Sequence, residues 1–198
     1  MYKPSLFQVV LFLANSRLPS QTHLRAVDTT AKETMDLGTL CTPYNFPLSL
    51  PNASILSIET TPVTNYTVAV PATFLYTQPP ISASDLSFCN VTVSYTHPGQ
   101  NDTIVVETWL PTDWNERLQA VGGSGSAAGR CSGAYMRMDG AMADGYATVT
   151  TDAGLGGDVD DASSWALDIE GNVNIHNLEN LASVSLYEEV SELSSRAV

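Results

Sequence analysis

The sequence predicts an α/β fold whose amino-terminal part is a loop-rich β arm. Residues 118–151 read as strand, glycine loop, helix and strand, which is the order of a βαβ unit. Residues 88–110 hold two β-branched runs separated by turn formers, and residues 36–80 are rich in Pro, Thr, Ser and Asn. We therefore expect a leader at 1–26, a Pro/Thr-rich arm at 27–87 and a partial α/β domain at 88–198.

Length and charge limit the possible partners. A chain of 198 residues is long enough to bury one core, and 43% of its residues are apolar. Eight Lys and Arg residues against 21 Asp and Glu residues give a formal net charge of −13. Such a charge repels phosphate groups and anionic lipid headgroups. Nucleic acids and membranes are therefore not expected as partners.

The amino terminus and the glycosylation sequons indicate export. Residues 5–14 form an apolar run that is too short to span a bilayer, as in the core of a secretory signal, or that alternatively forms a core strand or helix. Four sequons follow, at Asn52, Asn65, Asn90 and Asn101. Because such a cluster favours a solvent-facing arm on an exported chain, we predict a secreted glycoprotein.

The elements follow from periodicity and from turn formers. Seven prolines from Pro43 to Pro80 predict an extended arm with short strands, and residues 79–85 read as a linker. Residues 88–95 and 103–110 alternate, and the turn formers at 97–102 make them a hairpin that Pro111 ends. Residues 118–121 predict a buried strand, 132–144 a helix and 146–151 a second strand. Residues 178–193 have a helix-like pattern.

The glycine loop at 122–129 is the candidate site. In an open α/β sheet, ligands bind beyond the carboxyl ends of the strands. Gly122 and Gly123 could turn backbone N–H groups toward a developing negative charge, since no Cβ hinders the approach. One alternative is a tight turn without chemistry. Another is a dinucleotide-binding loop in which Asp152 holds a ribose, although the glycine spacing departs from that fingerprint.

Other candidate groups have structural interpretations that we favour. Ser132 does not directly follow a strand, as a nucleophile elbow requires, and is expected to cap a helix. Asp152 is expected to orient its loop through backbone N–H groups.

The histidines and the clustered aspartates give no candidate for a general base or a metal site. The three histidines, His23, His97 and His176, are expected to be exposed polar residues rather than bases. The aspartates at 158, 160 and 161 lack the spacing of a calcium loop and read as a solvated face. No metal site is therefore predicted.

Residues 88–186 resemble the tannase and feruloyl esterase family. The motifs, in order, are Cys89-x-Val-Thr-Val-Ser-Tyr-Thr-His-Pro-Gly-Gln-Asn-Asp, Thr108-Trp-Leu-Pro, Trp114-Asn-x-Arg117, Gly122-Gly-x-Gly, Gly145-Tyr-Ala, Thr151-Asp-Ala-Gly and Ser164-Trp-Ala-Leu167. Each motif is weak alone, but together and in this order they are a strong signal. The resemblance implies that Cys41 pairs with Cys89. An odd number of cysteines leaves at least one thiol, such as Cys131, without a partner in the chain.

The resemblance also implies a function and a cofactor. It implies an exported α/β-hydrolase with an inserted, calcium-binding lid that cleaves esters of plant phenolic acids such as ferulate or gallate. A serine would attack the ester carbonyl, a histidine would transfer the proton and an aspartate would orient the histidine. Gly122 and Gly123 match the family's first glycine loop and become candidates for the oxyanion hole.

The chain shows no Cys-Ser-x-Gly-Gly elbow before Val198. We therefore expect an inactive, incomplete α/β-hydrolase core, with the catalytic triad and the lid's calcium belonging to sequence downstream and no cofactor in this chain. The alternatives are a non-catalytic secreted binding or structural protein and, more remotely, a nicotinamide-dependent oxidoreductase. Failure to bind a nicotinamide cofactor would remove the last.

Overall fold

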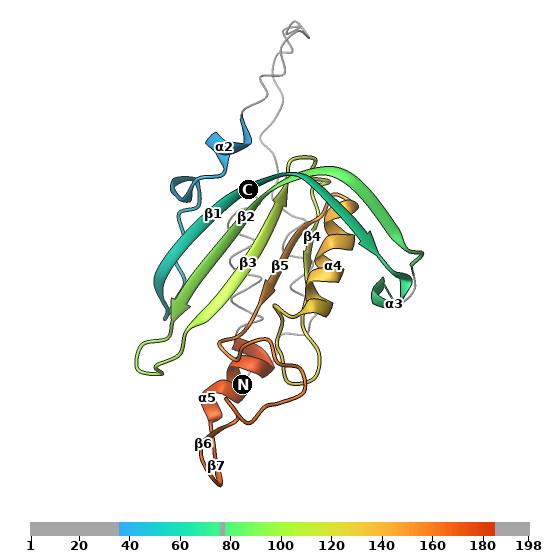
Figure 1. Ribbon diagram of the computed structural model, residues 1–198. Coiled ribbons are helices and arrows are strands. Elements are labelled where there is room, and N and C mark those ends of the chain that lie inside the picture. Colours follow the sequence, from blue (N-terminus) through green and yellow to red (C-terminus); the bar gives the residue numbers. More distant parts are fainter. Residues whose placement is uncertain (1–35, 76–77, 185–198) are drawn as a thin grey trace, which may run out of the picture. The chain divides into compact units, whose positions relative to one another are not determined.

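A five-stranded mixed sheet is the centre of the computed structural model, which describes residues 36–75 and 78–184 (Figure 1). The strands occur in the spatial order β1 (Ser54–Val70), β2 (Ile81–Thr96), β3 (Ile104–Pro111), β5 (Ala147–Thr151) and β4 (Leu118–Ala120). Neighbours from β1 to β5 pair antiparallel, whereas β4 and β5 are parallel. The predicted α/β character is thus confirmed as a mixed sheet with few helices.

The predicted hairpin is confirmed. β2 and β3 pair in register from Phe88 with Pro111 to Tyr95 with Ile104. The strand extends further back than predicted, because β2 already begins at Ile81. The expected linker at 79–85 is therefore wrong for residues 81–85, since pairing with β1 extends this segment, including the weak β former Ala83.

β1 corrects the prediction of short strands in the arm. It is a single strand of 17 residues that pairs with β2 from Ser54 to Val70. Pro62 lies within it, which is tolerated because β1 is an edge strand whose outer N–H groups need no ladder partner. β2 runs without interruption through the predicted boundary at 87/88, and we keep that domain division as a prediction.

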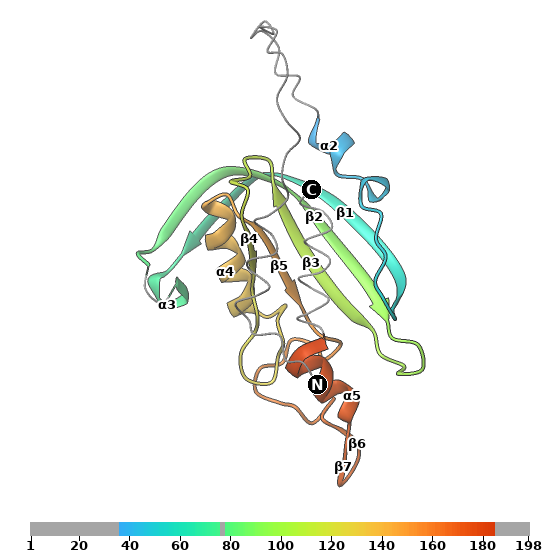
Figure 2. The same ribbon diagram turned by 180° about the vertical axis from the view of Figure 1, so that it is seen from behind.

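The βαβ unit is confirmed. α4 (Ser132–Ala143) connects the parallel strands β4 and β5 and lies beside β5 (Figure 2). Its apolar residues Ala134, Met138 and Met142 are buried against Phe88 and Trp109 of the sheet. Gly145 follows the helix with φ +82, a left-handed conformation in which a side chain would be strained.

Tyr66 joins β1 to the same helix. Its hydroxyl donates a hydrogen bond of 2.9 Å to the Oδ1 atom of Asp139 on α4. Burial and the neighbouring Asp139 raise the pKa of Tyr66 to about 12. Burial also raises the pKa of Asp139, although the Tyr66 hydrogen bond acts in the opposite direction.

A disulfide fastens the amino-terminal segment to the opposite face of the sheet. Cys41 follows α2 (Leu37–Leu40), and its sulfur is bonded to that of Cys89 on β2, as the resemblance implies. The 3-10 turn η1 (Pro43–Asn45) comes next along the chain. The two half-cystines belong to a buried cluster with Val91, Val93 and Val106, so the bond is enclosed by core side chains.

The segment after β5 forms a small, separate cluster. It contains the hairpin of β6 (Leu167–Ile169) and β7 (Asn172–Val173), then α5 (Ile175–Glu179) and the π-helical turn η2 (Asn180–Val184). Trp165, Ala153 and Leu155 form its buried centre. The helix predicted at 178–193 begins at Ile175, and its residues beyond 184, like the leader at 1–26, lie outside the described residues. The remaining element, α3 (Ala72–Leu75), follows β1 and precedes β2 along the chain.

Candidate functional site

The first glycine loop lies where the sequence predicts it, after β4 and before α4. The buried Val121 extends the parallel pairing beyond β4, because its N–H donates to the Val149 carbonyl at 2.8 Å. Gly122 follows directly, at the carboxyl end of the parallel pair. This loop and the segment after β5 are at the same end of the sheet (Figures 1 and 2), and Ser126 N–H donates to the Val159 carbonyl at 2.9 Å.

The loop is closed by its own backbone. The Gly123 N–H donates to the Ala128 carbonyl. A Cβ at Gly123 would overlap the backbone carbonyl of Ala127, which a small shift of a flexible side chain cannot relieve. Glycine is therefore required at 123 for the turn itself.

Gly122 differs from Gly123 in its exposure and in its hydrogen bonding. It is exposed, and a Cβ there would meet only the Ala128 carbonyl, at an ordinary 3.7 Å. Within the described residues, its N–H makes no backbone hydrogen bond, whereas that of Gly123 is taken by Ala128. Of the two predicted oxyanion-hole residues, Gly122 is thus the one whose N–H has no backbone partner among the described residues. Packing does not require a glycine at this position.

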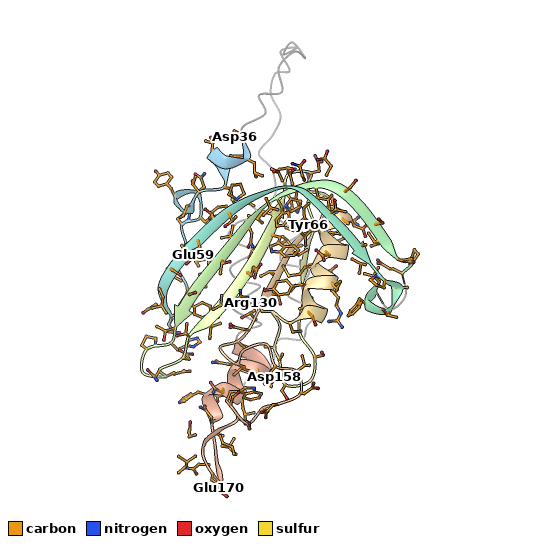
Figure 3. The ribbon with its side chains drawn as sticks, in the orientation of Figure 1. Asp36, Glu59, Tyr66, Arg130, Asp158 and Glu170 are labelled. Atoms are coloured by element: carbon orange, nitrogen blue, oxygen red, sulfur yellow. A yellow bond between two sulfur atoms is a disulfide. The ribbon has the colours of Figure 1, made fainter. Side chains whose placement is uncertain are left out.

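Arg130 fastens the end of the glycine loop to the sheet. Its Nη2 atom lies 3.2 Å from Oε2 of Glu107 on β3, and its Nη1 atom 3.8 Å from Oδ2 of Asp152 after β5. Its backbone N–H donates to the Thr150 hydroxyl at 3.1 Å. Figure 3 labels Arg130 between the sheet and the loops that follow its strands. One side chain therefore connects the loop to β3 and to the residue that follows β5.

Glu107 is the centre of this network, and it is only 6% exposed. Its Oε1 atom accepts hydrogen bonds from the Trp109 indole at 2.9 Å and from the Asn90 amide at 3.0 Å. Its Oε2 atom accepts from the Tyr135 hydroxyl at 2.8 Å. A buried carboxylate with an arginine and three further donors has the partners that its desolvation requires.

Two pKa shifts follow from the network. Burial and the hydrogen bond to Glu107 raise the pKa of Tyr135, against a smaller opposing effect of Arg130. Burial lowers the pKa of Arg130, but its contacts with Tyr135, Glu107 and Asp152 outweigh this and raise it. Arg130 therefore remains a cation, and Tyr135 remains a neutral donor. This network was not predicted from the sequence, although an acidic residue within the apolar strand 104–110 could have indicated it.

Asp152 has the structural role that the sequence predicts. Its Oδ1 atom accepts hydrogen bonds from the N–H groups of Val105, at 2.9 Å, and Gly154, at 2.8 Å. The other carboxylate oxygen faces Arg130. The side chain that a dinucleotide site would use for the ribose is thus engaged with the protein.

The structure corrects the prediction for Ser132. Cys131 occupies the N-cap position of α4, with extended backbone angles and no side-chain capping bond, and Ser132 is the first helical residue. Because the chain is already helical at Ser132, its hydroxyl does not cap the helix. The Cys131 thiol is free and 7% exposed, within the cluster beneath α4.

The structure also corrects the prediction for His97, which is buried rather than exposed. His97 is 7% exposed, and its Nδ1 atom lies 2.6 Å from Oδ2 of Asp102 across the hairpin turn. Asp102 also accepts hydrogen bonds from the His97 N–H, at 2.8 Å, and the Thr96 hydroxyl, at 3.0 Å. Burial raises the pKa of Asp102, but these bonds outweigh it and hold the pKa below its usual value.

His176 does not join the site. His176 is exposed on α5, 3.9 Å from Glu179, and His23 lies outside the described residues. The His97–Asp102 pair is linked instead to α5 and η2, since the Asn180 amide lies 3.4 Å from Oδ2 of Asp102. This pair fastens the hairpin turn to the segment after β5.

The acidic loop at 158–161 folds on itself. Asp158 accepts hydrogen bonds from the N–H groups of Asp160 and Asp161, at 2.9 and 3.2 Å, and all three residues are exposed. Across residues 36–75 and 78–184, no group of three or more His, Cys, Asp or Glu side chains is placed to hold a metal ion. Over the same residues, none of the helices has the length and apolar character needed to cross a bilayer.

Comparison with known proteins gives relatives of one kind. The chain is 44% identical over 105 residues to a protein named "Probable feruloyl esterase" from Arthroderma benhamiae, and 36% identical over 115 residues to a tannase from Aspergillus oryzae. The matches cover 52% and 54% of this chain but 19% of each relative. No protein-family model matches the chain.

The solved structures that superpose on this chain have the same kinds of name as these relatives. Tannin acyl hydrolase from Aspergillus niger superposes with a TM-score of 0.61 at 29% identity, over 81% of this chain and 30% of that one. Feruloyl esterase B from Aspergillus oryzae superposes with a TM-score of 0.55 at 21% identity, over 82% of this chain and 30% of that one, which supports the fold alone. Over about half of its length, the chain is therefore similar to proteins named feruloyl esterase and tannase, as its motifs predict.

Proposed function

We propose that this chain forms the oxyanion-binding part of a secreted serine ester hydrolase acting on plant phenolic-acid esters of the feruloyl or galloyl type. The observation that carries the proposal is Gly122, an exposed glycine whose N–H has no backbone partner among the described residues, at the carboxyl end of β4. The relatives named feruloyl esterase and tannase support the class of substrate.

In this proposal, the chain stabilises the negative charge that develops on the ester carbonyl oxygen, and it does not carry the nucleophile. When a serine oxygen bonds to the ester carbonyl carbon, the carbonyl oxygen becomes an oxyanion, and its collapse expels the alcohol after a proton transfer from histidine. The Gly122 N–H would donate to that oxyanion. Arg130, Glu107 and Asp152 are positioning residues, because they hold the loop against the sheet.

The same proposal makes the chain inactive by itself. Among the described residues, neither Ser132 nor His97 forms a nucleophile–base pair, because Ser132 is the first residue of α4 and His97 faces Asp102. The triad and the calcium-binding lid would belong to the parts of the relatives that this chain does not match. Export is supported by the disulfide between Cys41 and Cys89.

Two assays test the proposal. First, the purified 198-residue chain should not cleave methyl ferulate or methyl gallate. Second, residues 88–186, which carry the motifs listed above, should replace their counterpart in the Arthroderma protein and leave a chimaera that cleaves methyl ferulate. In that chimaera, Gly122→Ala should lower kcat by about 10²-fold, because a Cβ keeps the carbonyl oxygen from the N–H.

Gly133→Ala is the matched control. Gly133 is the second residue of α4, and a Cβ there would meet only the Arg137 guanidinium, at 3.8 Å. This variant should keep the activity of the chimaera. A chimaera that melts as its host does but cleaves no ester would contradict the proposal, as would equal activities of the two alanine variants.

A further inference from the structure

In the part of the chain that the structure describes, the outer edge of β1 is long and no other strand covers it. Within the described residues, β1 pairs with β2 alone along its 17 residues. Such an edge offers a row of free N–H and C=O groups to a second chain. β1 carries partial defences: Pro62, the exposed Glu59, and register shifts between Ile55 and Ser57 and between Val63 and Val68 that bend the strand. Leu56 on this strand is 56% exposed.

Two sequons lie on this edge. Asn52 is in the turn just before β1, and Asn65 lies within β1 at the register shift between Val63 and Tyr66. Asn101 lies in the turn between β2 and β3. All three asparagines are exposed, in the left-handed region with φ values of 61, 54 and 55. The hydroxyl residues that complete these sequons, Ser54, Thr67 and Thr103, are exposed as well.

The fourth sequon has a different environment. The Nδ2 atom of Asn90, to which a glycan would be joined, donates a 3.0 Å hydrogen bond to the buried Glu107. The Oδ1 atom of Asn90 is itself buried. A sugar on this amide would have to enter the space of Glu107 and its partners, so the folded sheet and a glycan at Asn90 exclude each other.

We propose that Asn52, Asn65 and Asn101 carry N-glycans in the folded chain, that Asn90 does not, and that the glycans beside β1 prevent edge-to-edge pairing of two copies. The donor is a polyprenyl diphosphate oligosaccharide. The asparagine Nδ2 forms a bond to C1 of the first sugar, one Nδ2 proton is released, and the bond from C1 to the diphosphate breaks. This proposal depends on export but not on ester hydrolysis, so it and the proposed esterase function can fail separately.

Sequon variants that keep every asparagine test the sites. The full chain is secreted from a yeast host, and the protein from the medium is treated in isotopically labelled water with a peptide N-glycosidase, which hydrolyses each glycosylated Asn side-chain amide to Asp, and is then mapped by peptide mass spectrometry. Label is expected at Asn52, Asn65 and Asn101 only. Thr67→Ala should remove one glycan from the secreted protein, whereas the matched variant Thr92→Ala, in the Asn90 sequon, should leave its mass unchanged apart from the substitution. A glycan at Asn90, no glycan at Asn65, or retention of an unglycosylated chain in the cells would overturn the proposal.

Light scattering tests the role of the glycans. The Ser54→Ala/Thr67→Ala double variant should associate at concentrations at which the glycosylated chain is monodisperse. Adding Asn65→Lys to it should restore monodispersity, since a charge on an edge strand disfavours pairing. If the double variant is as monodisperse as the glycosylated chain, the glycans do not guard the edge.

Discussion

At the scale of single residues, a buried carboxylate decides how the glycine loop is held. Glu107 lies in the middle of β3, where the alternation of the strand turns its side chain toward α4. Because Arg130 comes from the loop, the ion pair spans two elements that are distant in sequence. Removing the arginine would leave the carboxylate buried and without its cation.

Arg130→Met should therefore destabilise the fold by about 3 kcal/mol, the cost of leaving a buried charge unpaired. Urea denaturation measures this free energy. The control is Arg117→Met: Arg117 is exposed and donates to the Tyr146 hydroxyl at 3.2 Å, so its loss should cost less than about 1 kcal/mol. Equal losses in the two variants would show that the Glu107 ion pair contributes no more than a surface contact.

Asp102 should make stability depend on pH at the acidic end. Since folding lowers its pKa, the unfolded chain binds the proton more readily. The stabilisation is complete above the unperturbed value of about 4 and is lost as the pH falls through the folded pKa. Asp102→Asn should be less stable than the wild type at neutral pH, and the difference should shrink on acidification.

Melting temperatures measured between about pH 6 and pH 2 check this expectation. Asp168→Asn, on the exposed strand β6, serves as the control and should follow the wild-type curve. A difference in melting temperature between Asp102→Asn and the wild type that stays constant at all these pH values would contradict the expected role of Asp102.

The role of a side chain was predicted correctly where its hydrogen-bond partner is close in sequence. Asp152 was predicted to bind nearby N–H groups, and its bond to Gly154 lies within two residues. The burial of His97 was not predicted, because it depends on Asp102 and on packing against the segment around Asn180. The Glu107 network was missed for the same reason: apart from Trp109 on the same strand, its partners come from β2, from the glycine loop and from α4.

At the scale of elements, the glycine loop shows why two adjacent glycines are not equivalent. The backbone of the loop approaches Gly123 so closely that only hydrogen fits, whereas Gly122 has open space. The sequence shows the pair of glycines but not which one the turn requires, since that depends on the return of the chain at Ala128.

Gly123→Ala should cost about 1–3 kcal/mol, the usual penalty for overpacking. Gly122→Ala should change the free energy of unfolding by no more than about 0.5 kcal/mol, as for an exposed site. Thermal denaturation of both variants measures the difference. If the two are equally stable, the loop has relaxed around the new Cβ at 123, and the closed loop conformation is not required by the fold.

Strand and helix prediction was most accurate where periodicity and turn formers agree. The hairpin at 88–110 and the βαβ unit at 118–151 were predicted closely on this basis. β1 was not, because Pro62 and its many Thr and Ser residues resemble a loop when read locally. Pairing with β2 over its whole length overrides that local preference.

At the scale of the whole molecule, the described sheet depends on a covalent connection as well as on burial. The bond between Cys41 and Cys89 closes a loop across 48 positions of sequence. Chain-entropy arguments give such a cross-link about 4 kcal/mol of stabilisation. The sequence showed three cysteines, but the pairing came from family resemblance, because spacing alone cannot choose a partner.

The Cys41→Ala/Cys89→Ala double variant should thus lose about 4 kcal/mol of unfolding free energy, which urea denaturation measures. Cys131→Ala is the control, since this thiol forms no disulfide, and it should lose clearly less. A double variant as stable as the control would mean that the amino-terminal segment is held by its apolar contacts instead.

The position of this disulfide has a consequence for proteolysis. Cys41 precedes β1 and Cys89 lies on β2, so β1 and the turn after it are enclosed in one covalent ring. A single peptide-bond cleavage anywhere in the ring opens it without releasing a piece. A nicked molecule should migrate as one species on a non-reducing gel and separate into two only when a thiol reductant is added.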